Sequence, residues 1–426
     1  MPGHKYGRAG GCFSGAYDIT EISGADNIKK PEGIIKESIE NLSRIYGSKY
    51  AFYLTNGTTS GIHAVLRYAA LTGGKIALSR DCHISAVNGA VLFGIEVVFI
   101  ATEYKGQVPA PVKPNAVEAV LKDNPDVCMV LITSPNYYGV TAQLGKIAQI
   151  THDRGALLAV DEAHGAHFEF AGLSNISGIH KGVDIVCHSL HKTLPVYNQG
   201  AALHVCTNVV NKEIITDAVN MLGTTSPSYP LIASMERAVA SFSAKKYSRY
   251  KKLKENISYF KKILYSDVLA TDDYTRLVIE TSVTGFDAAD ILHEQFAIDV
   301  EAADFNNIIC IATPFNKKSD FRKLAKALAS IEKTDVSREN IKIPDMPEKE
   351  IELVKAYSSS KKMIPLDMAA GCICGTIIVS YPPGTPLVCP GETIDGYAVK
   401  YIKKVINAGG SVLGIEDDKI PVLERT

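Results

Sequence analysis

The sequence has no excess of charge of either sign, no long apolar run and no apolar leader at its N-terminus. Lysine and arginine number 45 against 46 aspartates and glutamates, for a formal net charge of −1. This balance gives no reason to expect nucleic acid or a membrane surface as a partner. No apolar run is long enough to span a bilayer, and Met1-Pro2-Gly3-His4-Lys5 leads into glycine and polar residues rather than the apolar centre of a signal peptide.

Cysteines at the spacing of a disulfide framework or a zinc site are also missing. The nine cysteines, an odd number, are scattered through predicted strands and loops, which suits reduced thiols in a cytoplasmic protein. Cys372 and Cys374 form a C-x-C pair with no second pair at zinc-finger spacing, so we expect no metal site. Neither the Walker pattern nor G-x-G-x-x-G is present.

What the sequence does contain is a regular alternation of apolar strands and helices. Such strands predict an α/β fold in which a mostly parallel sheet is covered by helices on both faces. A chain of 426 residues has room for a second domain, and weaker signals after residue 235 predict a smaller C-terminal α/β domain. The predicted strands of the sheet are 51–54, 75–78, 97–101, 127–133, 157–160, 183–186 and 201–205, and the predicted helices between them include 61–71, 116–122 and 144–154.

The predicted organisation has three parts. Residues 1–30, irregular and glycine-rich, form an ordered arm at an interface. A helix begins after Pro31 and ends at Gly47, opening a large domain over 31–235. The smaller domain spans 236–426, with a charged connection at about 332–362. A single long helix is expected from about Leu231 through the basic region 245–262.

A lysine at the end of a predicted core strand is the feature around which the chemistry is arranged. Lys192 follows the apolar run 183–186 and is flanked by His191 and Thr193. Most lysines are solvated surface charges, but a desolvated lysine has a lowered pKa and can attack an aldehyde. The strand end therefore predicts either a buried structural lysine or one that forms a Schiff base.

Four other predicted strand ends carry polar residues, in segments that include Gly57, His83, Ser134 and Asp161, and such ends are where ligands collect in parallel sheets. Gly57, Thr58 and Thr59 open a helix, where N–H groups and hydroxyls hold a phosphate or simply cap the helix. Asp161 is followed by His164 and by His167. The aspartate is interpreted as a metal ligand, a structural cap or a partner for a protonated ring nitrogen.

Six blocks, spread from end to end, give the chain its resemblance to a known family. It resembles pyridoxal-phosphate enzymes of fold type I, and more narrowly the ornithine/lysine/arginine decarboxylase family, in a short form with no receiver-like domain. The blocks are Pro2-Gly3-His4-Lys5, Ser134-Pro135-Asn136-Tyr137-Tyr138-Gly139, Asp161-Glu162-Ala163-His164-Gly165, Ser189-Leu190-His191-Lys192, Thr224-Thr225-Ser226-Pro227-Ser228-Tyr229 and Tyr381-Pro382-Pro383-Gly384-Thr385-Pro386.

The resemblance implies a role for each matching residue. Lys192 forms a Schiff base with pyridoxal 5′-phosphate, and Asp161 pairs with the pyridine nitrogen. His83, after another strand, stacks on the ring, and His164 lies near its phenolic oxygen. The phosphate is held by Gly57, Thr58, Thr59, Ser189 and His191. Thr225 and Ser226 come from the neighbouring subunit, which implies a homodimer with a shared active site.

The expected reaction is decarboxylation of arginine, lysine or ornithine to an amine and carbon dioxide, a step toward polyamines. A basic substrate needs an anionic partner, and the candidates are Asp18, Glu21, Asp26 and Glu392. Lys192 and His191 are the candidate proton donors to the α-carbon. The alternatives are another reaction on the same cofactor, such as transamination or a lyase reaction, and a non-catalytic homologue that only binds it.

Overall fold

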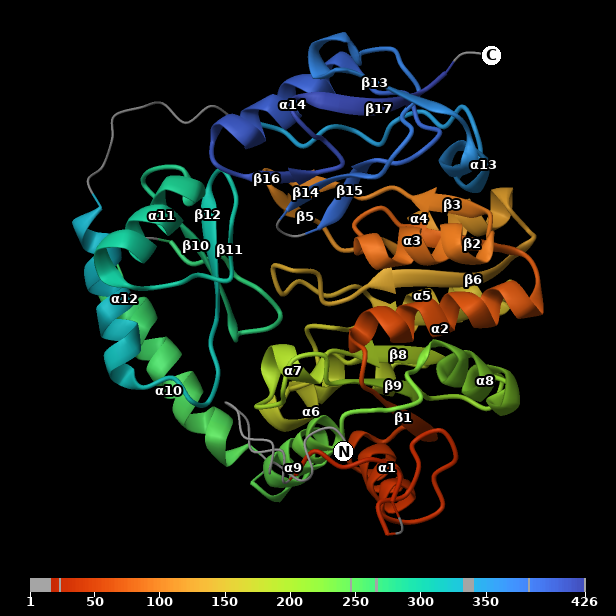
Figure 1. Cartoon of the computed structure of the whole chain (residues 1–426). Helices are drawn as coiled ribbons and strands as arrows, with labels where there is room; N and C mark the ends of the chain where they lie inside the picture. Colours follow the sequence, from red (N-terminus) through yellow and green to blue (C-terminus); the bar gives the residue numbers. More distant parts are fainter. Residues whose placement is uncertain are drawn as a thin grey trace, which may run out of the picture. The chain divides into compact units, whose positions relative to one another are not determined.

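The structure is a computed structural model that describes residues 17–22, 24–245, 247–264, 267–331, 341–381 and 384–424 (Figure 1). The Pro2-Gly3-His4-Lys5 block and most of the expected arm lie outside the described residues. The chain divides into two compact units, neither of which is continuous in sequence. The first comprises residues 1–74, 125–134 and 144–247, and the second comprises 75–124, 135–143 and 248–426.

The first unit is built on strands in the order β1-β9-β8-β7-β6. β6, β7 and β8 are parallel, while β9 runs antiparallel to both β8 and β1. Their side chains are almost all buried because apolar residues occupy both faces, which confirms the predicted, mostly parallel sheet. The bounds are β1 Tyr50–Leu54, β6 Val127–Thr133, β7 Leu157–Asp161, β8 Ile185–His188 and β9 Ala201–Val205.

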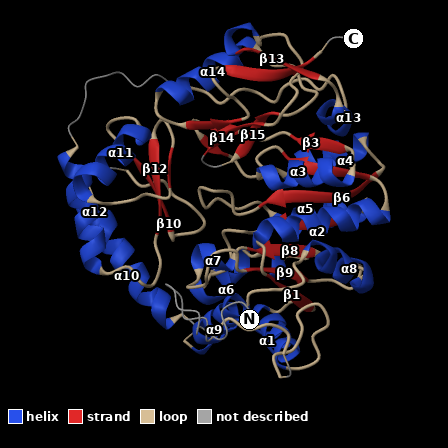
Figure 2. Ribbon diagram, in the orientation of Figure 1, coloured by secondary structure: helices blue, strands red, loops and turns tan. Residues whose placement is uncertain are grey.

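Helices cover this sheet (Figure 2). α2 packs on β8 and β9, and α5 packs on β7. Gly61 lets α2 approach closely, since a Cβ there would lie 2.7 Å from Leu54 Cδ1. The bounds are α1 Ile34–Tyr46, α2 Gly57–Thr72, α5 Leu144–Asp153, α6 Phe168–Ala171, η1 Ser174–Ile176, η2 Gly178–His180, α7 Leu190–Thr193, α8 Lys212–Leu222 and α9 Tyr229–Ala244.

The single long helix expected after Leu231 is wrong. The structure has two helices there, α9 ending at Ala244 and α10 covering Ser248–Ile263. The backbone of Tyr247 is left-handed, with φ of 66°, and its N–H donates to the carbonyl of Phe170 at 3.2 Å. A tertiary hydrogen bond therefore overrides the helix propensity of the basic run.

The second unit begins with the parallel pair β2 and β3 and continues in an antiparallel sheet of order β10-β12-β11. α10 packs on α12, and α11 packs on β12. The bounds are β2 Lys75–Ser79, α3 Ile84–Phe93, β3 Val97–Ile100, β4 Tyr104–Lys105, β5 Val108–Pro109, α4 Pro114–Asp123, β10 Arg276–Glu280, α11 Gly285–Phe296, β11 Ala302–Ala303, β12 Asn307–Ile311 and α12 Lys318–Ser330.

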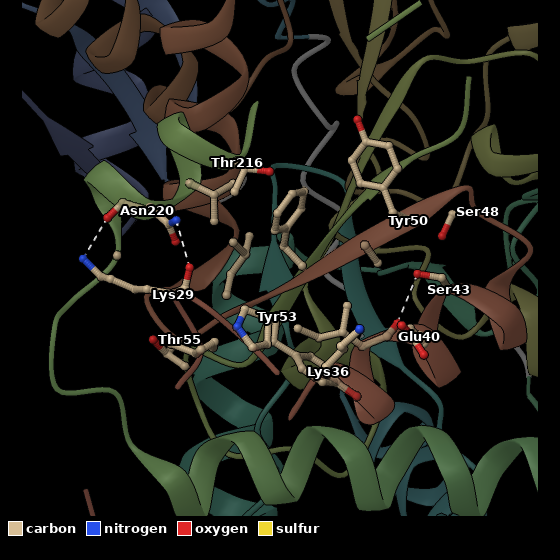
Figure 3. A pocket seen from close by; sticks show the side chains of 18 of the residues that line it. Lys29, Lys36, Glu40, Ser43, Ser48, Tyr50, Tyr53, Thr55, Thr216 and Asn220 are labelled. Carbon is tan, nitrogen blue, oxygen red and sulfur yellow. Dashed lines mark hydrogen bonds between the residues drawn. The ribbon is translucent and has the colours of Figure 1, made fainter. Parts of the chain in front are cut away.

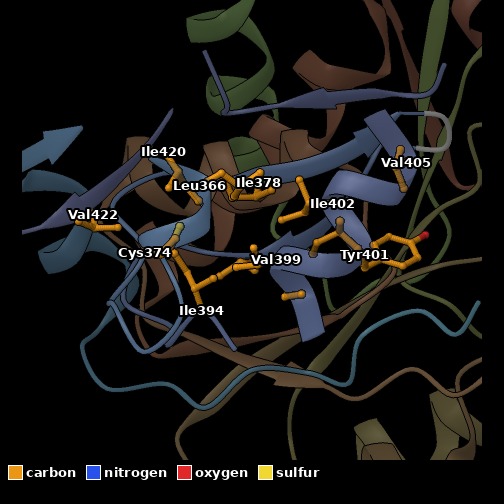
Figure 4. Packing of buried hydrophobic residues seen from close by; sticks show 14 of the residues in the cluster. Leu366, Cys374, Ile378, Ile394, Val399, Tyr401, Ile402, Val405, Ile420 and Val422 are labelled. Carbon is orange, nitrogen blue, oxygen red and sulfur yellow. The ribbon is translucent and has the colours of Figure 1, made fainter. Parts of the chain in front are cut away.

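The C-terminal part of this unit has its own apolar core (Figure 4). Ile378, Ile402, Ile420 and Val422 are at most 1% exposed, and burying such a side chain contributes about 1.5–3 kcal/mol. The expected connection at 332–362 instead contains α13 and the start of β13 within its described part. The bounds are α13 Leu353–Ser358, β13 Lys361–Pro365, η3 Leu366–Met368, β14 Ile378–Tyr381, β15 Thr385–Val388, α14 Gly396–Asn407, β16 Ser411–Leu413 and β17 Lys419–Leu423.

Two kinds of feature are absent from the described residues. No helix combines the length and apolar character needed to cross a bilayer. No group of three or more histidine, cysteine, aspartate or glutamate side chains is arranged to hold a metal ion. The domain limits of 1–30, 31–235 and 236–426 stay a prediction.

Candidate active site

Lys192 lies in a short helix directly after a core strand. β8 ends at His188, Ser189 is the residue that precedes α7, and Lys192 is the third residue of that helix. Its Nζ is 3.2 Å from His164 Nε2, and the lysine is half-buried. The structure thus brings together two residues that the sequence analysis assigned to one site, 28 positions apart in the chain.

Asp161 comes from the neighbouring strand end. It is the last residue of β7, it is 8% exposed, and it pairs in register with Cys187 of β8. Its Oδ1 accepts a hydrogen bond from the N–H of Ala163 at 3.1 Å, which fixes the carboxylate in the turn after the strand. Because β7 and β8 are parallel neighbours, the segments that carry Asp161 and Lys192 both leave the sheet at the carboxyl ends of these strands.

Glu162 links the segments that follow these strand ends, and sequence reasoning did not single it out. Its Oε1 accepts from Ser177 Oγ at 2.7 Å and lies 2.9 Å from His188 Nε2, while its Oε2 accepts from the N–H of Gly178 at 2.7 Å. Gly165 is required beside it, since a Cβ there would lie 2.5 Å from Glu162 Cγ. The available signal was its place inside the Asp-Glu-Ala-His-Gly block.

Burial controls the protonation of Glu162 and His188. Desolvation raises the pKa of Glu162 to about 8, although the hydrogen bonds from Gly178 and Ser177 oppose the shift. Desolvation likewise lowers the pKa of His188 to about 3. Each group therefore favours its neutral form, and their hydrogen bond holds the ends of β7 and β8 together without an isolated buried charge.

The N-terminus of α2 offers a cradle for an anion. Gly57 has φ of 72°, and its N–H donates to the carbonyl of Gln199 at 2.8 Å. Thr58 Oγ1 is buried and has no hydrogen-bond partner in the part of the chain that the structure describes. Thr59 is exposed. An orphaned hydroxyl in the first turn of a 16-residue helix suits a phosphate group.

Ser189 and His191 precede the lysine on the same turn. Ser189 Oγ is 3.3 Å from His191 Nδ1, and this nitrogen also contacts the carbonyl oxygen of Gly200 at 3.1 Å. Burial and the neighbouring Lys192 lower the pKa of His191, although its bond to Gly200 opposes the shift. A neutral imidazole with Nδ1–H donating to Gly200 leaves Nε2 as an acceptor.

The other predicted cofactor ligands lie in separate segments. His83 belongs to the second unit, where it caps α3 and its Nδ1 accepts from the N–H of Ser85 at 3.2 Å. Thr225 and Ser226 lie in the exposed loop between α8 and α9, where the Ser226 N–H donates to Thr224 Oγ1 at 3.2 Å. An exposed loop is available to another subunit.

Asp26, a predicted substrate ligand, has extensive backbone contacts. Desolvation raises its pKa, but hydrogen bonds from backbone N–H groups outweigh this and lower the pKa to about 2. Its carboxylate thereby caps the first turn of α1. The five donors are the N–H groups of Asn27, Glu32, Gly33, Ile35 and Lys36, at 2.8–3.3 Å.

The other three predicted substrate ligands differ in their surroundings. Glu21 accepts from Thr20 Oγ1 at 2.5 Å, and this bond lowers its pKa. Asp18 is half-buried. Both oxygens of Glu392 contact Arg80, at 2.6 and 2.8 Å.

A cavity of about 660 Å³ lies beside β1 (Figure 3). It is lined by α1, by one edge of β1 and by α8, and it includes Gly223 and Thr224 next to the predicted intersubunit residues. Lys29 and Asn220 close one end of it through two hydrogen bonds, at 2.9 and 3.2 Å. Neither Lys192 nor Asp161 lines this cavity, so it is not the candidate active site.

Comparison with known proteins places these features in a family. The model of the Orn/Lys/Arg decarboxylase major domain matches residues 12–268, and that of the family's C-terminal domain matches residues 340–419. The chain belongs to the Orn/Lys/Arg decarboxylase family. The expected enzyme class is therefore confirmed: this family member is an amino-acid carboxy-lyase for a basic amino acid.

Two arginine decarboxylases match nearly the full length of this chain, and a lysine decarboxylase matches half of it. An arginine decarboxylase from Bacillus subtilis is 29% identical, covering 99% of this chain and 93% of the relative. One from Halalkalibacterium halodurans is 30% identical with the same coverage. The inducible lysine decarboxylase of Escherichia coli K12 is 25% identical over only 51% of this chain and 32% of its own.

Solved structures confirm the fold. The lysine decarboxylase of Francisella novicida superposes with a TM-score of 0.84 at 17% identity, covering 100% of this chain and 78% of that one. Lysine decarboxylase A from Pseudomonas aeruginosa gives 0.85 at 17% identity, with the same coverage. The predicted fold type I architecture is confirmed.

Proposed function

We propose that this decarboxylase binds pyridoxal 5′-phosphate through Lys192 and converts arginine to its amine and carbon dioxide. The observation that carries the proposal is the 3.2 Å contact of Lys192 Nζ with His164 Nε2, next to the strand end that carries Asp161. Bound pyridoxal phosphate supplies an aldehyde that bonds to amines and a ring that accepts the electrons released with carbon dioxide. The orphaned hydroxyl of Thr58 fits its phosphate.

Each residue of the first unit has a distinct task in this proposal. Asp161 holds a proton on the ring nitrogen, because a buried carboxylate favours a cation beside it. His164 orients the Lys192 amine and contacts the ring oxygen. Lys192, or alternatively His191, returns a proton to the α-carbon once carbon dioxide has left.

The phosphate and ring have further proposed ligands. Thr58 supplies its free hydroxyl, and Ser189 and His191 approach the phosphate from the turn before Lys192. The exposed loop with Thr225 and Ser226 reaches the site of a neighbouring subunit. Gly57 and Thr59 at the start of α2, and His83 against the ring face, complete the set.

Arginine is the proposed substrate because relatives covering nearly the whole chain are arginine decarboxylases, whereas the lysine decarboxylase match covers half of it. A guanidinium group needs an ionised carboxylate. Of the four predicted candidates, Asp26 and Glu392 already have several hydrogen-bond partners, which argues against either of them as the ligand of the guanidinium group.

The enzyme is further proposed to be a cytoplasmic homodimer with shared active sites. The exposed loop at Thr225, the edge of β1 that pairs with no other strand of the described residues, and the cavity beside it are surfaces that a second copy would cover. The eight cysteines among the described residues are free thiols, which suits a reducing compartment. Light scattering of the purified protein measures the assembly. Mixing Lys192→Ala with Ser226→Ala subunits tests sharing, since a hybrid dimer would regain one intact site.

Incubation of the protein with pyridoxal phosphate and a panel of amino acids tests the proposal. We expect an absorbance band near the visible edge that Lys192→Ala abolishes, and release of carbon dioxide and amine from arginine in preference to lysine and ornithine. Both products are followed by mass spectrometry. Lys181→Ala, an exposed lysine of the same unit, is the matched control and should retain the band.

Two outcomes would redirect the proposal. Formation of a keto acid without carbon dioxide would indicate an aminotransferase on the same cofactor. Failure of the pure protein to take up pyridoxal phosphate at all would defeat the enzymatic assignment of Lys192 and favour a different role for the site.

A further inference from the structure

We propose that Glu392 is a positioning residue that holds the loop carrying His83, and not a ligand of the substrate. The loop in question is Arg80 to Ile84, between β2 and α3. The segment that holds it is 384–392, which follows β14 in the sequence and contains β15. This inference deepens the proposed function, because its catalytic consequence rests on His83 lying against the cofactor.

The principal contact is a buried ion pair between Arg80 and Glu392. Arg80 Nη1 donates to Glu392 Oε1 at 2.6 Å, and Arg80 Nη2 donates to Oε2 at 2.8 Å, so the pair is bidentate. The two residues are 4% and 3% exposed. Since removing one partner strands a buried charge, this pair fixes the relative position of the two segments far more firmly than a surface pair would.

Other contacts complete the attachment on both sides of Arg80 and Glu392. Arg80 Nη2 also donates to the carbonyl of Leu387 at 2.9 Å, and the guanidinium carbon lies 4.6 Å from the centre of the Phe99 ring. The N–H of Cys389 donates to Glu392 Oε2 at 2.7 Å. The arginine is therefore held by backbone, carboxylate and aromatic ring at once.

A second attachment lies on the far side of His83. The N–H of Ile84 donates to the carbonyl of Gly384 at 3.2 Å. His83 is thus bracketed, with Arg80 three residues before it and Ile84 directly after it both bound to the 384–392 segment. Its ring is then oriented by the hydrogen bond from the Ser85 N–H to Nδ1. These contacts fix both the backbone around His83 and the orientation of its imidazole ring.

The same contacts argue against a direct role for Glu392 in binding arginine. Both carboxylate oxygens are engaged by Arg80, and Oε2 also accepts from Cys389. A substrate guanidinium would have to displace the guanidinium of Arg80 and leave that cation buried without its partner. The ion pair that the substrate gained would be offset by the Arg80–Glu392 ion pair that the protein lost.

The test compares Glu392→Gln with wild type and with a matched control. The control is Glu96→Gln, which removes the partly exposed Lys75–Glu96 pair (2.9 Å) beside the same strand β2. Hydrogen exchange of peptides covering residues 80–86 is measured without cofactor. We expect faster exchange there in Glu392→Gln and unchanged exchange in Glu96→Gln, because only the first loosens the loop.

Cofactor and substrate binding are then measured separately. In Glu392→Gln the dissociation constant for pyridoxal phosphate should rise about tenfold, the effect of a weakened hydrogen bond to a charged group, with a changed circular-dichroism band of the bound cofactor. The KM for arginine at saturating cofactor should stay within about threefold, which is about half of a tenfold change on the free-energy scale. His83→Ala should reproduce the cofactor effects.

A double variant covers the case in which Glu392→Gln fails to fold. Arg80→Met/Glu392→Met removes both charges and leaves neither uncompensated, and it should show the same faster exchange at 80–86. Unchanged exchange in that loop, or a raised KM for arginine with an unchanged cofactor constant, overturns the inference. A wild-type protein that binds no pyridoxal phosphate defeats the proposed function alone, since the exchange result is independent of the cofactor.

Discussion

Glu162 Oε1 lies 2.9 Å from His188 Nε2, and the two residues are 0% and 1% exposed. Glu162 directly follows Asp161, and His188 comes four residues before Lys192. The pair therefore joins the two chain segments that carry the proposed ring-nitrogen partner and the proposed Schiff-base lysine. A shift of either segment would move one group relative to the other, and small misplacements of reacting groups are costly.

Truncation of Glu162 should destabilise the protein strongly. Glu162→Ala leaves the donors of Ser177 and Gly178 and the Nε2 of His188 without their partner, so we expect a loss of about 3–5 kcal/mol in unfolding free energy, whereas the isosteric Glu162→Gln should lose about 1–2 kcal/mol. Urea unfolding without cofactor measures both. Glu118→Gln, exposed on α4, is the control. Equal small losses for all three variants would contradict the role assigned to Glu162.

The same pair predicts how stability depends on pH. The pKa of Glu162 is raised from 4.5 to about 8 in the folded state, so its contribution is present at low pH and is lost as the pH rises from about 4.5 through 8. The pKa of His188 is lowered from 6.5 to about 3, so stability falls as the pH drops from 6.5 toward 3. Glu162→Gln should abolish the alkaline loss, as measured by unfolding at several pH values. An unchanged alkaline slope would contradict this.

Asp161→Asn should separate cofactor binding from turnover. An amide cannot hold the ring nitrogen protonated, so we expect kcat to fall about 10²- to 10³-fold, as when an electrostatic contact to the transition state is lost. Cofactor absorbance should persist because Lys192 is intact. Single-turnover release of carbon dioxide measures the effect. Activity close to that of wild type would exclude Asp161 as the ring-nitrogen partner.

Thr58→Val should have opposite effects on stability and on cofactor affinity. The hydroxyl of Thr58 is buried without a partner in the described structure, so its removal should leave unfolding free energy unchanged or slightly raised in the cofactor-free protein. The dissociation constant for pyridoxal phosphate should rise about tenfold, since one phosphate hydrogen bond is lost. Thr58→Ser is the control that keeps the hydroxyl. Reduced stability with normal affinity would assign Thr58 to packing.

Asp26→Ala should destabilise the chain rather than impair substrate binding. Loss of the helix cap should cost about 1–2 kcal/mol at pH 7. Because the pKa of Asp26 is lowered from 3.8 to about 2, its contribution is present above pH 4 and is lost as the pH falls through 2, so the variant and wild type should converge in acid. Unfolding curves and the KM for arginine are compared with those of Asp18→Asn. A raised KM with normal stability would restore Asp26 as a substrate ligand.

Strand positions were predictable because apolar runs reveal buried strands directly. All seven predicted strands occur, and 127–133 and 201–205 match the structure residue for residue. β8 differs: it ends at His188 rather than at residue 186. A histidine does not look like a core residue in sequence, but this one is buried with Glu162 as a hydrogen-bond partner and with the rings of Tyr46 and His204 about 5 Å away.

The residue types of the site were predictable, but their partners were not. The motifs pointed to Lys192, Asp161 and His164, and local spacing placed them at strand ends. Nothing in the sequence shows that Glu392 faces an arginine 312 positions away or that Asp26 caps α1, because such contacts depend on packing. Sequence reasoning named Glu392 as a candidate substrate ligand because it could not show that Arg80 engages both carboxylate oxygens.

The Arg80–Glu392 pair also sets an order of events in the making of this protein. Arg80 is synthesised early, and its partner follows 312 residues later, so the His83 loop stays unfastened for most of translation. Closing so long a loop is an entropic cost that only the completed unit can offset. Attachment of the His83 loop should therefore be among the last steps of folding, and chains that end before residue 392 should keep this loop unattached.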